Sequence, residues 1–173
     1  MTRPIRATLS ASALRHNYAL LKEHAPKSRA FAVVKANAYG HGVDFAARTL
    51  KDADGFATLE LDSALRLRQL GIQQPILLLE GFFSDEELPL FDRHGLASVL
   101  HCTPQVTALM QAVLKRPLDV FIKLNTGMNR LGFVDGSARH ALGMAALGRN
   151  FGDVTLMTHL ANADLADGIA APL

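Results

Sequence analysis

The 173-residue sequence has one cysteine, no long apolar run and no large excess of either charge. The single thiol, Cys102, excludes an intramolecular disulfide and suits a reducing compartment, and a zinc site built from paired cysteines is excluded as well. No segment approaches the roughly 18 consecutive apolar residues of a membrane span, and the first residues lack the apolar centre of a signal peptide. These absences predict a cytoplasmic protein with no transmembrane helix and no bound metal.

The charges that are present are mixed along the chain. The sequence has 18 basic and 16 acidic residues and a formal net charge of +2, so it lacks the basic stripe that nucleic-acid binding requires. Hydrophobic residues make up 49% of the chain and charged residues 20%, which is typical of a globular protein with a sizeable core. We therefore expect neither a nucleic acid nor a membrane as a partner.

Short apolar segments alternate with segments of helical pattern. The expected strands are residues 31–34, 55–59, 75–79, 96–100, 118–124 and 154–157, and the expected helices between them are residues 44–50, 60–70, 84–93, 103–114 and 137–147. A strand over Ile5 to Leu9 and a helix capped by Ser10 or Ser12 precede them. Such alternation predicts parallel βα units, either in an open sheet or in a barrel. The absence of GxGxxG and GxxxxGK[ST] motifs counts against a dinucleotide or P-loop site.

A lysine, Lys35, ends the first of these apolar segments, where the chain turns polar and glycine-rich. Residues 32–42 read AVVKANAYGHG. A buried ammonium must be paired or lose its proton, and a desolvated lysine amine is the form that adds to a carbonyl carbon. Tyr39 supplies a phenol, and a turn that leads into a helix is a geometry that binds phosphate. From the local sequence alone, a lysine that extends its amine into water is an equal alternative.

Two further strand ends carry polar side chains. Lys123 lies in the apolar segment before Leu124, and Arg130 follows seven residues later, beyond a glycine turn. Two buried cations repel each other, so this pattern predicts a negative group between them. His159 follows the sixth strand. A lone histidine at such a position is more often structural. In a barrel, however, the functional side chains gather at the carboxyl ends of the strands, and Lys35, Lys123 and His159 all lie at such ends.

These segments resemble the signatures of bacterial alanine racemases. AVVKANAYGHG resembles the pyridoxal phosphate attachment segment, KLNTGMNRLGF (123–133) resembles the second signature, and MTHLANAD (157–164) resembles the M-x-H-x-A-x-A-D run. The motifs occur in the family's order and span essentially the whole chain. The resemblance implies a (β/α)8 TIM-barrel fold of which residues 1–173 are the N-terminal part, with about six βα units, no second domain and no C-terminal β domain.

The resemblance also implies a function and roles for the site residues. The protein would interconvert L-alanine and D-alanine with pyridoxal phosphate, as a cytoplasmic homodimer that supplies D-alanine for the cell wall or takes part in alanine catabolism. Lys35 would hold the cofactor as an aldimine and act as one of two bases on the α-carbon. Tyr39 would contact the phosphate, Arg130 the phenolic oxygen of the cofactor and the substrate carboxylate, and His159 the surroundings of the pyridine ring.

Three other positions carry expectations from the resemblance. The lysine at the position of Lys123 is commonly carbamylated in the family, which turns a cation into an anion that can hold the arginine. Asn125 stands where many relatives have aspartate. Val33 and Leu78 would lie near the cofactor, although an aliphatic residue such as Leu78 is equally typical of a plain core.

Two alternatives remain at this point. A racemase of lysine, arginine or serine is the nearer one, because parts beyond this sequence largely set the substrate size. A single-domain pyridoxal phosphate carrier is the other, and it resembles the sequence less. The second base of the family is a tyrosine from the partner subunit's C-terminal domain, so we expect residues 1–173 alone to be inactive, with open strand edges that favour aggregation.

Overall fold

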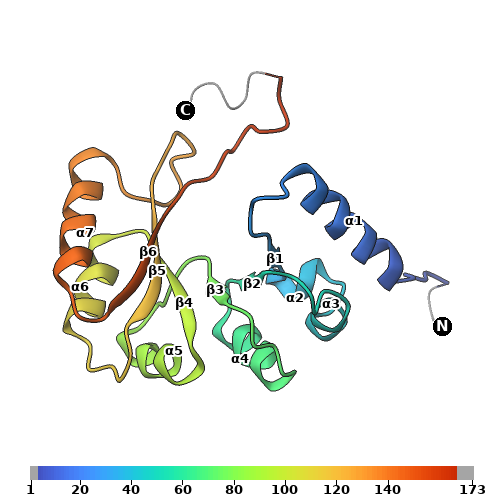
Figure 1. The fold of residues 1–173 in the computed structure, drawn as a ribbon, viewed down its shortest axis with the longest axis horizontal. Helices are drawn as coiled ribbons and strands as arrows, with labels where there is room; N and C mark the ends of the chain where they lie inside the picture. Colours follow the sequence, from blue (N-terminus) through green and yellow to red (C-terminus); the bar gives the residue numbers. More distant parts are fainter. Residues whose placement is uncertain (1–3, 167–173) are drawn as a thin grey trace. The chain divides into compact units, whose positions relative to one another are not determined.

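The computed structural model describes residues 4–166, within which six strands alternate with helices (Figure 1). By its internal contacts the chain divides into two compact units, the first ending at Gln74 and the second beginning at Pro75. Each unit has its own parallel strands with helices in the connections between them. The expected α/β architecture of repeated βα units is therefore present.

The first unit places a short parallel pair of strands among helices. Its elements are α1 (Ala11–His24), β1 (Phe31–Val33), α2 (Lys35–Tyr39), α3 (Val43–Thr49), β2 (Gly55–Thr58) and α4 (Leu61–Gln69). The register of the pair runs from Phe31 opposite Gly55 to Val33 opposite Ala57. Every residue of β2 is buried, as expected for a strand covered on both faces.

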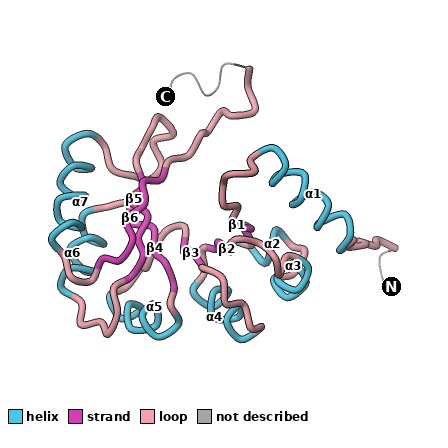
Figure 2. Tube along the Cα trace, viewed as in Figure 1, coloured by secondary structure: helices cyan, strands magenta, loops and turns pink. Residues whose placement is uncertain are grey.

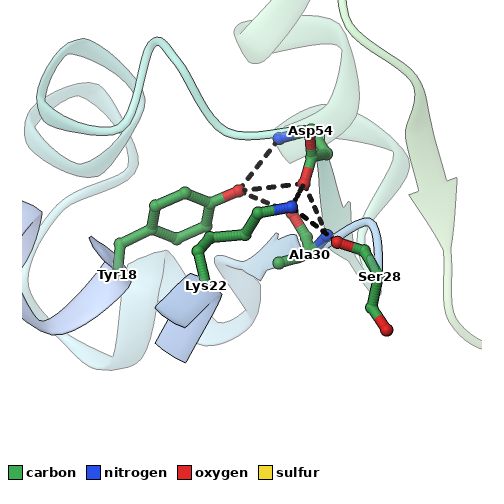
Figure 3. Close-up of polar contacts among 5 residues, drawn as sticks. All are labelled: Tyr18, Lys22, Ser28, Ala30 and Asp54. Carbon is green, nitrogen blue, oxygen red and sulfur yellow. Dashed lines mark hydrogen bonds and ion pairs between the residues drawn. The ribbon is translucent and has the colours of Figure 1, made fainter. Parts of the chain in front are cut away.

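Helix α1 is held by polar contacts, since none of its residues is buried (Figure 3). Asp54, just before β2, accepts hydrogen bonds from Lys22 Nζ and from the backbone N–H of Ala30, each at 2.7 Å. Tyr18 Oη donates to the carbonyl oxygen of Ala30 at 3.0 Å and accepts from the N–H of Asp54 at 3.1 Å. The hydrogen bond from Lys22, followed by that from Ala30, lowers the pKa of Asp54. This network joins α1 to the chain ahead of both strands.

The second unit contains four parallel strands with helices between them. Its elements are β3 (Ile76–Leu78), the 3-10 turn η1 (Asp85–Glu87), α5 (Leu88–His94), β4 (Leu96–Leu100), α6 (Thr103–Gln111), β5 (Leu118–Lys123), α7 (Asp135–Leu147) and β6 (Phe151–Met157). The strands pair β3 with β4, β4 with β5 and β5 with β6. Their fully buried side chains include Ile76, Leu78, Val99, Leu100, Val120 and Ile122.

The helices of this unit cover its strands. Helix α5 packs against β4, α7 packs against β5 and β6, and α6 lies against α7. Phe91 of α5 is fully buried and meets Phe82 edge to face, with ring centroids 6.1 Å apart. Irregular chain joins β5 to α7 and follows β6 (Figure 2). These loops begin at the carboxyl ends of β5 and β6. The second group of predicted site residues, Lys123, Arg130 and His159, lies at these strand ends and in these loops.

Most expected elements are found close to their predicted bounds, with some corrections. The strand expected over Ile5 to Leu9 is wrong, because these residues are irregular and Ile5 is 79% exposed, with no strand partner among the described residues. Helix α6 ends at Gln111 rather than at Leu114, which leaves Val113 88% exposed. Strand β6 begins three residues earlier than expected. Across residues 4–166, the structure has no helix long and apolar enough to cross a bilayer.

Candidate functional site

The polar side chains predicted to carry chemistry lie at or just beyond the carboxyl ends of strands in each unit. Lys35 is two residues beyond the end of β1, Lys123 is the last residue of β5, and His159 is two residues beyond β6. In parallel βα units, this end of the strands is where side chains and helix N-termini converge on ligands. The sequence-based placement of all three residues is therefore matched by the strand bounds.

In the first unit, Lys35 leads directly into a left-handed turn. Ala36, Asn37 and Ala38 have φ values of 49°, 53° and 52°, and Tyr39 has a φ of 54°. The turn is closed by backbone hydrogen bonds from Ala38 N–H to Val34 O at 2.8 Å and from Gly42 N–H to Asn37 O at 2.9 Å. Four consecutive left-handed residues without a glycine are costly, and such strain clusters at ligand sites. The sequence pattern indicated a turn here but did not indicate that its residues would adopt left-handed backbone angles.

The turn sets the direction of the neighbouring side chains. The amine of Lys35 lies 5.9 Å from the ring centroid of Tyr39, within the range of a cation–π contact. Tyr39 is 60% exposed, and Val33, the last residue of β1, is 41% exposed. A cavity of about 500 Å³ adjoins this turn and is lined by Val33, Val34, Ala38, Tyr39 and His41 together with residues of the N-terminal segment, α1 and α3. The first unit thus presents an amine, a phenol and an apolar surface together.

Glu60 was not among the predicted site residues. It lies two residues beyond the carboxyl end of β2, the strand that pairs with β1. It is the N-cap residue of α4, yet its side chain makes no capping hydrogen bond and instead accepts from Thr58 Oγ1 at 3.0 Å. Burial tends to raise the pKa of Glu60, but hydrogen bonds from its own N–H, from Thr58 and from the N–H of Ala36 outweigh that effect and lower it. These hydrogen-bond donors therefore favour the charged form of the Glu60 carboxylate next to the turn.

In the second unit, Lys123 is the buried cation that the sequence predicted. Its side chain is 7% exposed. Burial lowers the pKa of Lys123, the charge of Arg130 lowers it further, and the charge of Glu80 acts in the opposite direction. The strand end is rigid, since Lys123 O accepts from Phe133 N–H and Leu124 N–H donates to Met157 O, both at 2.8 Å. A lysine in such a place has more neutral amine near neutral pH than an exposed lysine has.

Arg130 and His159 share a small pocket with Lys123. Its lining comprises Lys123, Leu124, Asn125, Thr126, Met128, Arg130, Leu131 and His159. The loop that carries Arg130 is shaped by Asn125, whose Oδ1 accepts from the N–H of Gly127 at 3.1 Å and of Asn129 at 3.0 Å. The structure therefore brings together three residues that the sequence placed in one site. Asn125 has a clear role as the organiser of that loop.

A polar group at the ends of β3 and β4 was not predicted. The side chain of Gln105, 7% exposed, donates to the carbonyl oxygens of Glu80 at 2.8 Å and Phe82 at 3.1 Å, and accepts from the N–H of His101 at 3.0 Å. Burial lowers the pKa of His101, a hydrogen bond to Glu80 O raises it, and the charge of Lys123 lowers it. The sequence gave one signal for this group, a titratable residue just beyond each of two buried strands, Glu80 after β3 and His101 after β4.

Leu78 is fully buried in β3, and its burial supports the alternative of a core residue. Nothing in the geometry of the described residues tests a contact between Leu78 and a cofactor. Among residues 4–166, the structure has no group of three or more His, Cys, Asp or Glu side chains that could hold a metal ion.

The family model described as "Alanine racemase, N-terminal domain" matches residues 9–171. The chain belongs to the alanine racemase N-terminal domain family. An alanine racemase of Erwinia tasmaniensis is 46% identical over 173 residues, which is all of this chain and 49% of the relative. The chain therefore spans about half the length of the curated relatives it matches.

Solved structures of alanine racemases share the fold of this family member. The biosynthetic alanine racemase of Pseudomonas aeruginosa matches with a TM-score of 0.90 and 43% identity over 94% of this chain and 46% of that chain. A histidine racemase from Leuconostoc mesenteroides matches with a TM-score of 0.84 and 29% identity over 95% of this chain and 46% of that chain. The expected fold, part of an alanine racemase barrel, is confirmed.

Proposed function

We propose that this alanine racemase family chain is the cofactor-binding part of a pyridoxal-phosphate-dependent enzyme that interconverts L-alanine and D-alanine. The observation that carries the proposal is the amine of Lys35, held at the carboxyl end of β1 by a strained left-handed turn. A strained backbone persists only where surrounding contacts hold it, and here those contacts orient a nucleophilic side chain.

The donor groups of the chain fit pyridoxal phosphate. An amine suits its aldehyde, a phenol suits its phosphate, and a guanidinium suits its phenolic oxygen and the carboxylate of an amino acid. At Gly40, where φ is 85°, an added Cβ would meet nothing within 4 Å, so this side of the turn is open to a ligand. When bound, the cofactor supplies an electron sink that makes the α-hydrogen of an amino acid acidic enough to be removed.

The residues of the chain divide the remaining work among them. Lys35 Nζ would hold the cofactor covalently, and its free amine would take the α-proton of the substrate from one face. Tyr39 Oη would donate a hydrogen bond to the phosphate. Arg130 would hold the substrate carboxylate, and His159 would lie beside the ring. The opposite face requires a second base, which we assign to a tyrosine of the partner subunit's C-terminal domain in a homodimer.

We include a carbamate on Lys123 in this proposal. The neutral amine of Lys123 attacks the carbon of CO₂, one carbon–oxygen π bond becomes an oxyanion, and the amine loses a proton to solvent. The lowered pKa of Lys123 favours the neutral amine that this step needs. The product is an anion in the same pocket as Arg130, which removes the repulsion between two cations.

Cofactor capture tests the role of Lys35. Pyridoxal phosphate is added to the purified chain, the visible absorbance is recorded, and the adduct is reduced with borohydride before peptide mass mapping. We expect the label on Lys35 and its loss in Lys35→Met, whereas Lys27→Met, at an exposed lysine beyond α1, retains it. A label spread over exposed lysines, unchanged in Lys35→Met, would contradict the assignment.

The substrate is a separate question, because the histidine racemase shows the same fold at 29% identity. Racemisation of alanine, histidine, lysine, arginine and serine by the complete protein that contains this chain separates these possibilities. We expect kcat/KM to be highest for alanine. A larger value for another amino acid would replace the proposed substrate and leave the role of Lys35 intact.

A further inference from the structure

We propose that His101 is a positioning residue of the Lys123 site and that its imidazolium form stabilises a carbamate on the neighbouring Lys123 amine. The inference rests on the carbamate included in the proposed function, and it adds a partner that shares the charge of the site. Neither the sequence motifs nor the pocket around Arg130 pointed to His101.

Strand register places the two residues side by side. Leu100 pairs with Ile122 across the parallel strands β4 and β5, so the next position along each strand brings His101 opposite Lys123. Paired residues of neighbouring strands are about 4.8 Å apart, and their side chains leave the same face of the sheet. Lys123 itself also pairs with Met157 of β6. The row at the strand ends is therefore His101, Lys123 and Met157.

The backbone at His101 is fixed at the end of β4. Gln105 Oε1 accepts from the backbone N–H of His101 at 3.0 Å, and Gln105 Nε2 donates to Glu80 O at 2.8 Å, which joins the ends of β3 and β4. The backbone carbonyl of Glu80 favours the protonated form and so raises the pKa of His101, against the larger effect of burial, which lowers it. A Cβ at Gly81 would lie 2.3 Å from Val99 O and 2.7 Å from Gln105 Nε2, so this connection has no room to shift.

The charges around the pair come from each neighbouring element. Glu80 after β3 attracts both cations, and Arg130 from the loop after β5 repels Lys123. His159 after β6 shares the small pocket with Lys123, and α6 contributes the uncharged Gln105. With an ammonium on Lys123, protonation of His101 adds repulsion. With a carbamate on Lys123, the same protonation adds attraction.

Linkage makes this relation reciprocal. If a proton on His101 strengthens CO₂ capture by Lys123, then CO₂ capture must raise the proton affinity of His101 by the same factor. For opposite charges at neighbouring strand positions we expect a factor of about ten. The carbamate should therefore survive to lower pH than an isolated lysine carbamate, since protonation of His101 offsets the competing protonation of the amine.

Carbamate occupancy is measured by ¹³C NMR on the purified chain in ¹³C-labelled bicarbonate between about pH 5.5 and 8.5. Lys123→Met identifies the signal by removing it. We expect His101→Gln to bind CO₂ almost as tightly as wild type near pH 8.5, where His101 is neutral with or without the carbamate, and progressively more weakly as pH falls, with about tenfold as the low-pH limit of the difference. His140→Gln, at an exposed histidine of α7, is the control and should follow wild type throughout.

A second measurement does not depend on CO₂. NMR titration of the His101 ring in Lys123→Glu, which places an anion beside it permanently, should give a higher pKa than in wild type without bicarbonate. An unchanged pKa there, or a carbamate on Lys123 whose pH dependence is the same in His101→Gln, would overturn the role of His101 and leave the modification standing. No ¹³C signal on Lys123 would instead refute the modification, and the Lys123→Glu titration would still decide whether His101 responds to charge at Lys123.

Discussion

Ala36, Asn37 and Ala38 follow Lys35 with φ values near +50°, and each residue in that conformation costs about 1–2 kcal/mol relative to the right-handed one. The cost is lower for asparagine than for alanine, because the short polar side chain of asparagine forms local hydrogen bonds. Here Asn37 Oδ1 accepts from the N–H of Val43 at 3.0 Å, which joins the turn to the first residue of α3. The side chain of Asn37 thus compensates part of the cost of the turn.

The first prediction concerns that compensation. Asn37→Ala removes an acceptor from a backbone N–H and places alanine in a left-handed position, so we expect the free energy of unfolding to fall by about 1–2 kcal/mol. Ala36→Gly is the matched variant at the neighbouring position with φ of 49°. It should be neutral or stabilising, because glycine adopts this conformation without steric cost. Urea unfolding followed by circular dichroism measures both, and a stable Asn37→Ala beside a destabilised Ala36→Gly would contradict this account of the turn.

At the scale of elements, the close approach of Gly81 to β4 fixes the connection after β3. Gly81 has a φ of 74°, and an added Cβ would lie 2.3 Å from Val99 O. Gly95 also has a positive φ, 57°, but a Cβ there would meet nothing within 4 Å. The two glycines therefore separate the cost of backbone conformation from the cost of a steric clash within one unit.

The second prediction compares alanine at these two glycines. Gly95→Ala should lower the free energy of unfolding by about 1 kcal/mol, the cost of a left-handed alanine at a helix end. Gly81→Ala should cost about 2–4 kcal/mol, because the clash is with a backbone oxygen and adds to the conformational cost. Chemical denaturation of both variants gives the comparison. Equal losses would show that the chain around Val99 moves aside without cost.

The third prediction concerns the anchoring of α1 through Asp54. The folded-state pKa of Asp54 is lowered, so its carboxylate stabilises the fold above the unfolded-state value of about 3.9, and that stabilisation is lost as pH falls through the folded-state pKa. Asp54→Asn should therefore unfold at lower urea than wild type at neutral pH, and the difference should shrink below about pH 4. Asp52→Asn, at an exposed neighbour, is the control. A difference between Asp54→Asn and wild type that persists unchanged in acid would point to packing rather than charge.

These elements also show what sequence could and could not predict. Strand β4 has its predicted bounds because all five of its residues are buried and four of them are apolar. The expected strand over residues 5–9 failed because an apolar pattern forms a strand only where another strand offers hydrogen bonds. The hand of the turn after Lys35 depends on contacts from Val34 and Val43, and the adjacency of His101 and Lys123 depends on register. Neither is encoded in local periodicity.

At the scale of the whole molecule, strand β6 is an edge. It pairs with β5 on one side, and none of the described residues pairs with it on the other. Val154 and Leu156 lie on one face of β6 and are 41% and 56% exposed. An edge strand with exposed aliphatic side chains is a template for pairing with another chain or with further chain of the same protein.

The last prediction is that the chain of 173 residues self-associates through this edge. In the double variant Val154→Lys and Leu156→Lys, the apolar surface is replaced by charge, so association should weaken by about 2–3 kcal/mol, or roughly 30- to 150-fold in the dissociation constant. Leu147→Lys, at an 86% exposed position of α7, also adds positive charge but lies away from the edge, and it should leave association unchanged. Sedimentation velocity over a range of concentrations measures the constants. Equal weakening in both variants would show that added charge, and not the β6 edge, controls association, because only the double variant changes the surface on which a second strand would pair.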